Sequence, residues 1–390
     1  MVTWNNWSGR VVGQPDRISF ARSESDIQAS VAQASRSNEK VRVAGSGHSH
    51  YGLVPSEHTI LDISGLSGVI STDAETLTAQ VWAGTKIYSL GRPLHEAGLG
   101  LSNQGDIDRQ AIAGAVSTGT HGTGLTLSNL SASVVGATIV TGSGDMLELV
   151  QSDRSALWQA CRLSLGALGV ITRLDLAVRP AYRLIETGRI CSYDEIRPEI
   201  DSLPAQHRHF EFFWFPARDS VVAKSVDETD SEPEYPVGKE GSRCAWSYEV
   251  LPNDRSVRHT EMEYSVPVKD GPACLDAIRS LIHQRFSDLV WPVEYRTIAA
   301  DDVWLSTANG GSVATISVHQ GIDADDESLF RACEEVFLSF GGRPHWGKVH
   351  YLSGDQLACM HPQWHDWWTV RDEIDPKRTF VNDALEQLAP

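Results

Sequence analysis

Val41-Arg42-Val43-Ala44-Gly45-Ser46-Gly47-His48-Ser49 is predicted to form a short strand that runs directly into a loop of two glycines, two serines and a histidine. Because glycine lets the backbone approach a ligand closely, such a loop can aim N–H groups at a phosphate. The spacing is neither that of a GxGxxG dinucleotide motif nor that of a GxxxxGK[ST] phosphate loop. It also misses the GxSxG elbow of hydrolases, because Tyr51 stands where the last glycine belongs. A ligand-binding loop and a tight turn with a surface histidine are both compatible with this stretch.

A second stretch, residues 114–124, holds four glycines and four hydroxyl side chains in eleven residues. A packed core would not select this composition, because glycine buries no side chain and costs conformational entropy. A backbone that lines a flat or phosphorylated ligand would select it. A third small-residue run, 166–171, leads into a predicted strand, where close strand packing is the simpler interpretation.

The composition limits the classes of partner. The 390 residues are 41% hydrophobic and 22% charged, with a formal net charge of −18, which is typical of a globular protein of two domains. Nucleic acid and anionic membranes need clustered basic groups, so neither is expected as a partner. No stretch resembles a signal peptide or a membrane span. We therefore expect a cytoplasmic protein, monomeric or a small homo-oligomer, that binds a small molecule.

Neither cysteines nor histidines form a metal motif. The six cysteines are scattered without a CxxC pair, which favours reduced thiols. His361 and His365 are four apart, but Pro362 and the absence of the glutamate exclude an HExxH site. His48 and His50 lack an accompanying carboxylate pattern. No metal is predicted.

The predicted elements change character near residue 180. Before residue 180, short strands alternate with helices, and residues 134–150 form a hairpin. The predicted strands are 17–21, 41–44, 59–63, 76–82 and 169–178. The predicted helices run from Ser23 or Ser25 through 34, from 85 through 97, and from Ser152 or Asp153 through 160. After it, longer strands (211–215, 261–266, 293–298, 313–319) accompany helices at 273–286 and 327–340, with a surface loop at 227–241. This pattern predicts an α+β fold in which helices cover one face of an antiparallel sheet.

Polar residues lie two apart on the later strands and therefore share a sheet face: Glu294 with Arg296, and Ser317 with His319. Such a set can bind several hydroxyl groups, although a solvated face with a cross-strand salt bridge is the plainer alternative. Nearer the C-terminus, Lys348 follows a Pro-His-Trp-Gly run and can bind a substrate oxygen or stabilise an anionic ring.

Taken together, the motifs resemble those of FAD enzymes of the vanillyl-alcohol-oxidase type, and within it the sugar-1,4-lactone and alditol oxidase branch. The matching pieces follow the same order nearly end to end, and they are residues 4–9, 45–49, 105–124, 262–267, 294–296 and 344–348.

This resemblance implies a two-domain flavoenzyme. A bipartite FAD-binding domain is formed by residues 1–180 and the returning C-terminal segment 345–390, and 181–344 form an α+β cap domain with an antiparallel sheet. FAD is implied to be covalently bound through His48 to the 8α-methyl carbon of the flavin. The implied cofactor-binding residues are Ala44, Gly45, Ser46, Gly47, His48, Ser49, Gly105, Asp106, Gly114, Ser117, Gly119, Thr120, His121, Gly122, Gly169, Ile171, His345 and Asn382.

The resemblance also implies the chemistry. Hydride passes from the carbinol carbon of a polyol or sugar lactone to flavin N5, and O2 is reduced to H2O2. Lys348 or His319 is the candidate for assisting removal of the hydroxyl proton. The implied catalytic residues are Lys348, His319, Glu294, Arg296 and Asp106.

Two neighbouring residues refine this expectation. Gly105 falls at a position that bears on oxygen access in this family, and glycine there favours an oxidase. Asp106 stands where related enzymes often have serine, and a carboxylate there disfavours an anionic reduced ring unless it is paired or protonated. It could instead bind a substrate hydroxyl.

The sequence thus predicts an FAD-dependent oxidase of polyols or sugar lactones. The nearest alternative is a dehydrogenase of the same fold that uses another electron acceptor. A non-catalytic flavin-binding protein would be yellow but not bleached by any polyol or lactone, and a zinc hydrolase built on the histidine-rich tail would be colourless.

Overall fold

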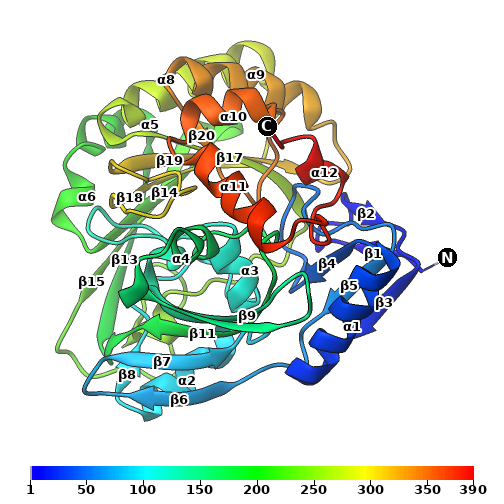
Figure 1. Ribbon diagram of the computed structural model, residues 1–390. Helices are drawn as coiled ribbons and strands as arrows, with labels where there is room; N and C mark the ends of the chain where they lie inside the picture. Colours follow the sequence, from blue (N-terminus) through cyan, green and yellow to red (C-terminus); the bar gives the residue numbers. More distant parts are fainter. Residues whose placement is uncertain (1) are drawn as a thin grey trace.

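A short parallel sheet carries the first glycine loop. The structure, a computed structural model, describes residues 2–390 (Figure 1). Strands β3 (Arg17–Phe20), β5 (Thr59–Asp62) and β4 (Val41–Ala44) pair in that order, all parallel. Helix α1 (Glu24–Ser37) joins β3 to β4 and begins after Ser23, whose side chain accepts a hydrogen bond from the Asp26 N–H. The predicted strand and helix are confirmed here, and the loop at 45–49 leaves the carboxyl end of β4.

A five-stranded antiparallel sheet forms the second layer of the N-terminal half. Its order is β10-β9-β11-β7-β6, and the predicted hairpin is confirmed as the β9–β10 pair. The bounds are β6 (Val69–Asp73), β7 (Thr78–Trp82), β9 (Val134–Val140), β10 (Met146–Val150) and β11 (Val170–Ala177), with helices α2 (Tyr88–Glu96), α3 (Ile112–Ser117) and α4 (Ala156–Cys161) and the short strands β1 (Trp4–Asn5), β2 (Val12–Gly13), β8 (Leu99–Gly100) and β12 (Arg179–Pro180).

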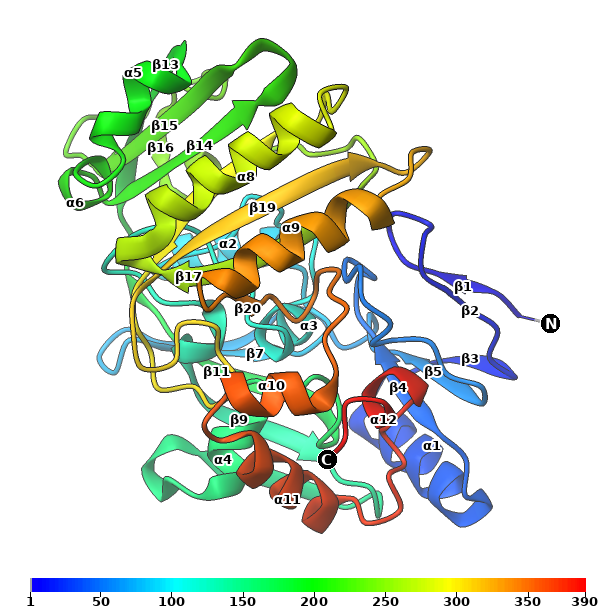
Figure 2. The same cartoon turned by 90° about the horizontal axis from the view of Figure 1, so that it is seen from above.

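An eight-stranded antiparallel sheet dominates the rest of the molecule. Its order is β16-β13-β15-β14-β18-β19-β17-β20. The bounds are β13 (Arg183–Ser192), β14 (His209–Phe215), β15 (Ser220–Glu228), β16 (Cys244–Trp246), β17 (His259–Pro267), β18 (Val293–Ile298), β19 (Val313–Gly321) and β20 (Arg343–Pro344). Helices α8 (Gly271–Arg285) and α9 (Glu327–Ser339) lie side by side along one face (Figure 2), as predicted. Short helices α5 (Tyr193–Ile196), α6 (Leu203–Gln206) and α7 (Ser247–Val250) complete this part.

The two faces of this sheet differ in chemistry. On β17, Tyr264 stacks on Phe337 of α9 and donates a hydrogen bond to Glu334, 2.5 Å away, so the even positions face the helices. Because side chains alternate along a strand, Glu261 and Glu263 face the opposite way. The α+β class with an antiparallel sheet is confirmed, and its polar face is the one that meets the N-terminal half.

The C-terminal segment returns to the N-terminal half. Helices α10 (Gly354–Met360), α11 (Trp364–Ile374) and α12 (Asp383–Glu386) end the chain, and α11 lies beside α4 in both views (Figures 1 and 2). The buried Arg42 of β4 donates hydrogen bonds to the carbonyls of Leu53, Leu165, Gly166 and Phe380. These contacts support the bipartite division at 1–180, 181–344 and 345–390, which stays a proposal.

Some predicted boundaries are wrong for local reasons. Helix α2 begins at Tyr88 rather than residue 85, because the Thr85 hydroxyl donates to the Trp82 carbonyl in a turn. Helix α4 is capped by Ser155, since Arg154 takes a left-handed conformation (φ 45°) that interrupts any earlier start. The short helix α3 and the long strands β13 and β15 were not predicted. No helix within residues 2–390 is both long and apolar enough to span a bilayer.

Candidate active site

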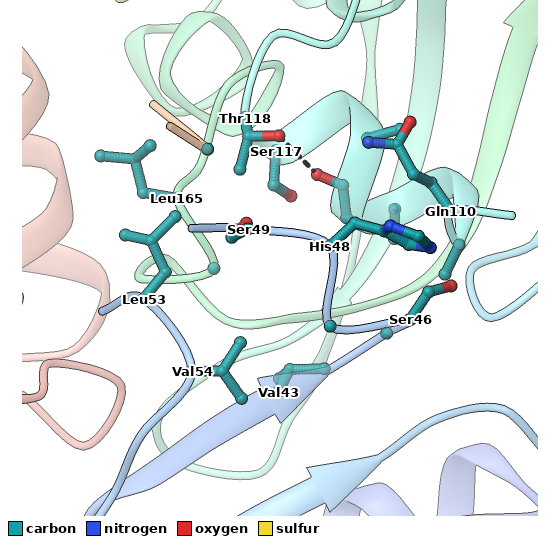
Figure 3. Close-up of a pocket in the computed structure, with 18 of the residues that line it drawn as sticks. Val43, Ser46, His48, Ser49, Leu53, Val54, Gln110, Ser117, Thr118 and Leu165 are labelled. Carbon is teal, nitrogen blue, oxygen red and sulfur yellow. Dashed lines mark hydrogen bonds between the residues drawn. The ribbon is translucent and has the colours of Figure 1, made fainter. Parts of the chain in front are cut away.

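The first cavity lies between the β4 loop, α3 and the 164–171 segment, and has a volume of about 920 Å³ (Figure 3). Glycines, alanines, hydroxyl side chains and aliphatic groups supply most of its lining: Gly45, Ser46, Gly47, His48, Ser49, Leu53, Val54, Ala111, Ala113, Gly114, Ala115, Ser117, Thr118, Ser164, Leu165, Gly166, Gly169 and Ile171. An apolar lining with a few polar groups is typical of small-molecule and cofactor sites.

Glycine is required in this cavity for specific reasons. Gly47 has a φ of 68°, a left-handed conformation that other residues rarely adopt. Gly114 lies in α3, and a Cβ at this position would meet no atom within 4 Å. Since Gly114 lines the cavity, a larger side chain there would occupy space that a ligand can use. The elongated, backbone-rich cavity therefore fits an FAD molecule.

His48 occupies the end of this cavity nearest the second one. Its ring stacks on Trp7 at a centroid distance of 5.5 Å. Burial, followed by the charges of Lys348 and Lys86, lowers the pKa of His48 to about 4. The imidazole is therefore neutral at physiological pH and retains a lone pair that can bond to an electrophilic carbon.

The second cavity, of about 1130 Å³, lies beneath the polar face of the eight-stranded sheet. Gln110, His345 and Lys348 line both cavities, so the two adjoin at these residues. The rest of its lining comes from four strands and four loops: Gly105, Asp106, Ile107, Thr120, His121, Phe213, Asp254, Arg255, Ser256, Val257, His259, Glu261, Glu263, Trp291, Pro292, Glu294, Arg296 and His319.

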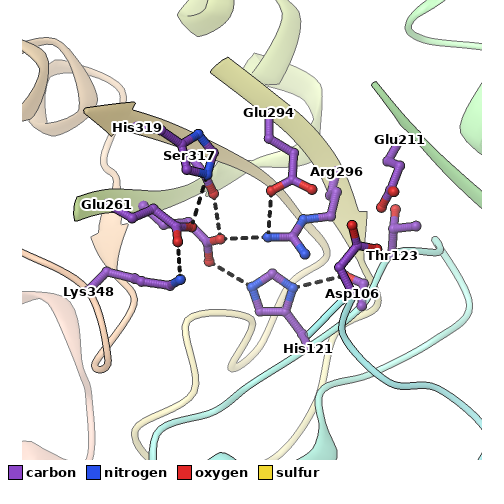
Figure 4. Close-up of polar contacts among 12 residues, drawn as sticks. Asp106, His121, Thr123, Glu211, Glu261, Glu294, Arg296, Ser317, His319 and Lys348 are labelled. Carbon is purple, nitrogen blue, oxygen red and sulfur yellow. Dashed lines mark hydrogen bonds and ion pairs between the residues drawn. The ribbon is translucent and has the colours of Figure 1, made fainter. Parts of the chain in front are cut away.

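Glu263 is the centre of a buried hydrogen-bond network in this cavity, and its partners His121, Arg296 and Ser317 are labelled in Figure 4. His121 Nε2 lies 2.7 Å from Glu263 Oε1, while Arg296 Nη2 and Ser317 Oγ donate to Oε2 at 2.9 and 2.6 Å. Burial opposes ionisation, but the charges of His121 and Arg296 hold the pKa of Glu263 well below its usual value. The carboxylate thus ties the second glycine-rich stretch to strands β18 and β19.

Two further glutamates differ from each other in charge. Glu261 forms an ion pair with Lys348, and this charge outweighs burial to hold the pKa of Glu261 well below its usual value. Glu294 lies 3.1 Å from Arg296 Nη2, yet burial, together with the neighbouring Glu211 charge, raises its pKa to about 8. Glu294 is therefore a protonated hydrogen-bond donor near neutral pH.

Asp106 is neutralised by cations rather than free to meet a substrate. Arg255 donates to Asp106 Oδ2 from Nη2 at 2.7 Å and from Nε at 3.2 Å, and Lys224 Nζ lies 3.6 Å from Oδ1. Although burial favours protonation, the charges of Lys224 and Arg255 hold the Asp106 pKa below its usual value. An unpaired carboxylate at this position would repel an anionic reduced flavin ring, but the Asp106 carboxylate is paired with two cations. These contacts give no support to a role for Asp106 in binding substrate.

The structure brings most of the predicted site residues to one cavity or the other. Eleven line the first cavity: Gly45, Ser46, Gly47, His48, Ser49, Gly114, Ser117, Gly169, Ile171, His345 and Lys348. Gly105, Asp106, Thr120, His121, Glu294, Arg296 and His319 line the second.

Four predicted cofactor residues, Ala44, Gly119, Gly122 and Asn382, line neither cavity. Ala44 is buried within β4, and Gly119 forms a turn with a φ of 75°. A Cβ on Gly122 would lie 2.2 Å from the Gln104 carbonyl oxygen, so close packing explains that glycine. Asn382 donates to the carbonyls of Gly52 and Pro55 and caps α12, which is a structural role.

The sequence reasoning missed the acidic pair on β17. Glu261 and Glu263 were quoted only as part of a strand or a motif, without a role. A signal was available, because His259, Glu261, Glu263 and Ser265 alternate with Met262, Tyr264 and Val266. When one face of a strand is strongly apolar and the charged residues on the opposite face are also buried, those charged residues are predicted to form a functional cluster.

The fold and the two adjoining cavities define an FAD-dependent oxidoreductase, and comparison with known proteins agrees. An FAD binding domain family matches residues 15–150, and the D-arabinono-1,4-lactone oxidase family matches residues 174–243 and 238–388. The chain belongs to this lactone oxidase family, within the vanillyl-alcohol-oxidase type of flavoenzymes.

Individual proteins that resemble this chain agree with this family assignment. An L-gulono-1,4-lactone dehydrogenase of Mycobacterium tuberculosis is 35% identical, with 99% of this chain and 98% of the relative covered. An alditol oxidase of a Streptomyces species is 27% identical, covering 98% of each chain. The crystal structure of cholesterol oxidase from B. sterolicum has a TM-score of 0.88 over 100% of this chain and 96% of that chain, at 15% identity, which shows a shared fold.

Proposed function

We propose that the protein is an oxidase of neutral polyols or sugar lactones that carries FAD covalently on His48 and reduces O2 to H2O2. The observation that carries this proposal is the junction of the two cavities at Gln110, His345 and Lys348. A backbone-lined cofactor cavity there opens onto a cavity rich in hydrogen-bonding side chains. Bound FAD supplies a hydride acceptor for the substrate's carbinol carbon.

The charges of the second cavity favour a neutral substrate. Its three cationic side chains are all paired with carboxylates: Arg255 with Asp106, Arg296 with Glu263, and Lys348 with Glu261. No cation in this lining is left over for a carboxylate or phosphate on the substrate. A polyol or a closed lactone instead needs several fixed donors and acceptors, because a buried group left without its partner costs about 1–3 kcal/mol.

The structure favours His319 over Lys348 as the proton acceptor. His319 Nδ1 lies 2.8 Å from the Pro292 carbonyl, so Nδ1 donates and the Nε2 lone pair is free. Burial lowers the pKa of His319 to about 4, which keeps this imidazole neutral. Lys348 is engaged as an ammonium by Glu261 and is suited to donate a hydrogen bond to the substrate oxygen. Glu294 and Arg296 then bind further hydroxyl groups.

A dehydrogenase is the second candidate, and the identity of 35% with a lactone dehydrogenase favours it. Gly105 supports the oxidase. A Cβ at this position would lie 3.0 Å from the His121 carbonyl and narrow the second cavity beside it. We further propose that the enzyme is cytoplasmic, which its six unpaired cysteines favour, and that it works as a monomer or small homo-oligomer; light scattering would test the oligomeric state.

One pair of measurements tests the function. The protein is reduced anaerobically with a panel of polyols and sugar lactones while flavin absorbance is followed, and H2O2 is then measured in air. Bleaching followed by stoichiometric peroxide supports the oxidase. Bleaching with reoxidation only by an added dye supports the dehydrogenase, and no bleaching by any member of the panel contradicts both.

The covalent bond is tested separately by acid precipitation. The yellow colour should stay in the pellet for the unchanged protein. It should move to the supernatant for His48→Ala, whereas a surface variant, His365→Ala, should keep its colour in the pellet. Release of flavin from the unchanged protein would contradict the covalent bond without affecting the proposed reaction.

A further inference from the structure

Three imidazoles and a carboxylate lie together beside the second cavity; His259, Glu261 and His319 line the cavity, and the His50 ring lies next to the His259 ring, 5.9 Å away between centroids. His50 follows the first glycine loop, His259 and Glu261 lie on β17, and His319 lies on β19. Ligand-type atoms of His50, His259 and Glu261 all lie within 4.8 Å of one another. His259 Nε2 is 3.7 Å from Glu261 Oε2, and His319 Nε2 is 3.7 Å from Glu261 Oε1. The proposed reaction uses His319 but gives no role to His50 or His259.

Backbone carbonyls fix the orientation of two of these rings. His259 Nδ1 lies 2.9 Å from the Val257 carbonyl oxygen, and His319 Nδ1 lies 2.8 Å from that of Pro292. A carbonyl can only accept, so each Nδ1 donates, and in the neutral imidazole the Nε2 on the side of Glu261 then carries a lone pair. Histidines that bind metals in proteins are held in this way, with the other ring nitrogen donating to a carbonyl or carboxylate.

His50 points to a ligand independently. Its side chain is buried, and its Nδ1 has no hydrogen-bond partner within residues 2–390. A buried polar atom without a partner costs about 1–3 kcal/mol, and a bound cation would remove this cost. Burial also lowers the pKa of His50 well below its usual value, so the ring is a neutral potential ligand.

The spacing suits a tetrahedral ion of the Zn²⁺ type. Bonds of ~2.0–2.1 Å from Zn²⁺ to nitrogen and oxygen place neighbouring ligand atoms roughly 3.3 Å apart, close to the observed 3.7 Å between His259 and Glu261. A cation already lies beside one of these donors, because the Lys348 ammonium binds the same oxygen, Glu261 Oε2. Positive charge is therefore already stable next to Glu261.

We propose that His50, His259 and Glu261 form a site for a divalent ion of the Zn²⁺ class, and that the ion takes the place of the Lys348 ammonium and excludes the substrate. His319 flanks the site from the other carboxylate oxygen. The fourth coordination position faces the cavity and is filled by water. Only the exclusion of substrate rests on the proposed function, since ion binding depends on these side chains alone.

Equilibrium dialysis of the flavin-loaded protein against Zn²⁺, followed by metal analysis, tests the binding. One ion per chain is expected, with affinity at least about tenfold weaker in His259→Gln and His50→Gln. His365→Gln on exposed α11 should bind as the unchanged protein does. Thermal unfolding of each variant checks that it is folded. No bound zinc, or equal zinc in all four proteins, would overturn the proposal.

Two additional measurements test separately whether the ion competes with the Lys348 ammonium and whether it excludes the substrate. Lys348→Met should bind Zn²⁺ at least about tenfold more tightly, because the competing ammonium is gone, and unchanged affinity would contradict the shared position. Zn²⁺ should also inhibit turnover competitively with substrate. Stoichiometric zinc binding without inhibition would contradict the location of the substrate, and hence the proposed function, while the metal site would stand.

Discussion

The two cavities recognise their ligands by different means. The first is lined largely by glycine, alanine, aliphatic and hydroxyl groups, and residues from the 42–54, 110–118, 164–171 and 345–348 segments supply most of this lining. The second is lined by acids, bases and imidazoles, half of which stand on strands of one sheet and half on the loops beside it. A long cofactor is thus bound by shape and backbone, whereas a small polar substrate is bound by paired side chains. The first kind of site leaves motifs in the sequence, and the second leaves only strand periodicity.

Filling the first cavity should reduce flavin content, and this is the largest effect that we expect. In Gly114→Val, the side chain would extend into space where no atom lies within 4 Å of the Cβ, so the helix can accept it but FAD cannot bind beside it. Flavin content measured by absorbance should fall by more than about tenfold. Ala29→Val in the exposed face of α1 controls for the cost of a β-branched residue in a helix. Full flavin content in Gly114→Val would show that the cofactor lies elsewhere.

Changing the proposed base of the second cavity should affect rate and spare the cofactor. His319→Asn keeps a polar group but removes the Nε2 lone pair. The rate of flavin reduction by substrate should fall by about 10²–10⁴, the usual contribution of a general base. Flavin content should match that of the unchanged protein. A rate within about threefold of that of the unchanged protein would show that another group accepts the proton, and Lys348 would be the next candidate.

The Glu263 network of the second cavity should be important for stability. Glu263→Gln leaves Arg296 and His121 without their buried carboxylate, and breaking a buried ion pair in this way costs about 3–5 kcal/mol. The matched control is Glu199→Gln, which breaks the exposed pair with Arg189 and should cost at most about 1 kcal/mol. Urea unfolding measures both free energies. Similar losses in the two variants would show that the network is not a structural link.

The last effect depends on pH. The pKa of Glu294 is raised from 4.5 to about 8 by burial, so between these values the folded protein holds a proton that the unfolded chain has lost. Its contribution to stability is therefore complete below pH 4.5 and falls as pH rises towards 8, by at most about 1.4 kcal/mol per pH unit. Glu294→Gln removes this term, so the variant should gain stability relative to the original as pH increases. A difference that is constant from pH 5 to 8 would contradict a neutral Glu294.

This contrast also explains what the sequence could predict. That residues 45–49 and Gly114 line one cavity could be predicted, because their order along the chain resembles that of a known flavoenzyme family. The alternation along β17 could have indicated Glu263 but not its role, since that role depends on Arg296 and Ser317, which come from strands far along the chain. The neutralisation of Asp106 depends likewise on Lys224 and Arg255, which no local pattern connects to it.

The missed elements follow the same physical logic. Strand β13 is exposed along much of its length, with Ile190 80% exposed, so its pattern lacks the regular alternation that predicts a strand. Helix α3 consists of Ile, Ala, Gly, Val and Ser, a composition that favours a loop unless tertiary contacts hold it. Both elements are formed by their neighbours rather than by local preference.

The four carbonyls held by Arg42 have a consequence for biosynthesis. One of them belongs to Phe380, more than three hundred residues after Arg42 in the chain. During translation, the Arg42 guanidinium therefore stays without this partner until Phe380 has been made. The loop that follows β4 should accordingly reach its final conformation late, and a correctly formed first cavity would report that the segment around Phe380 has folded.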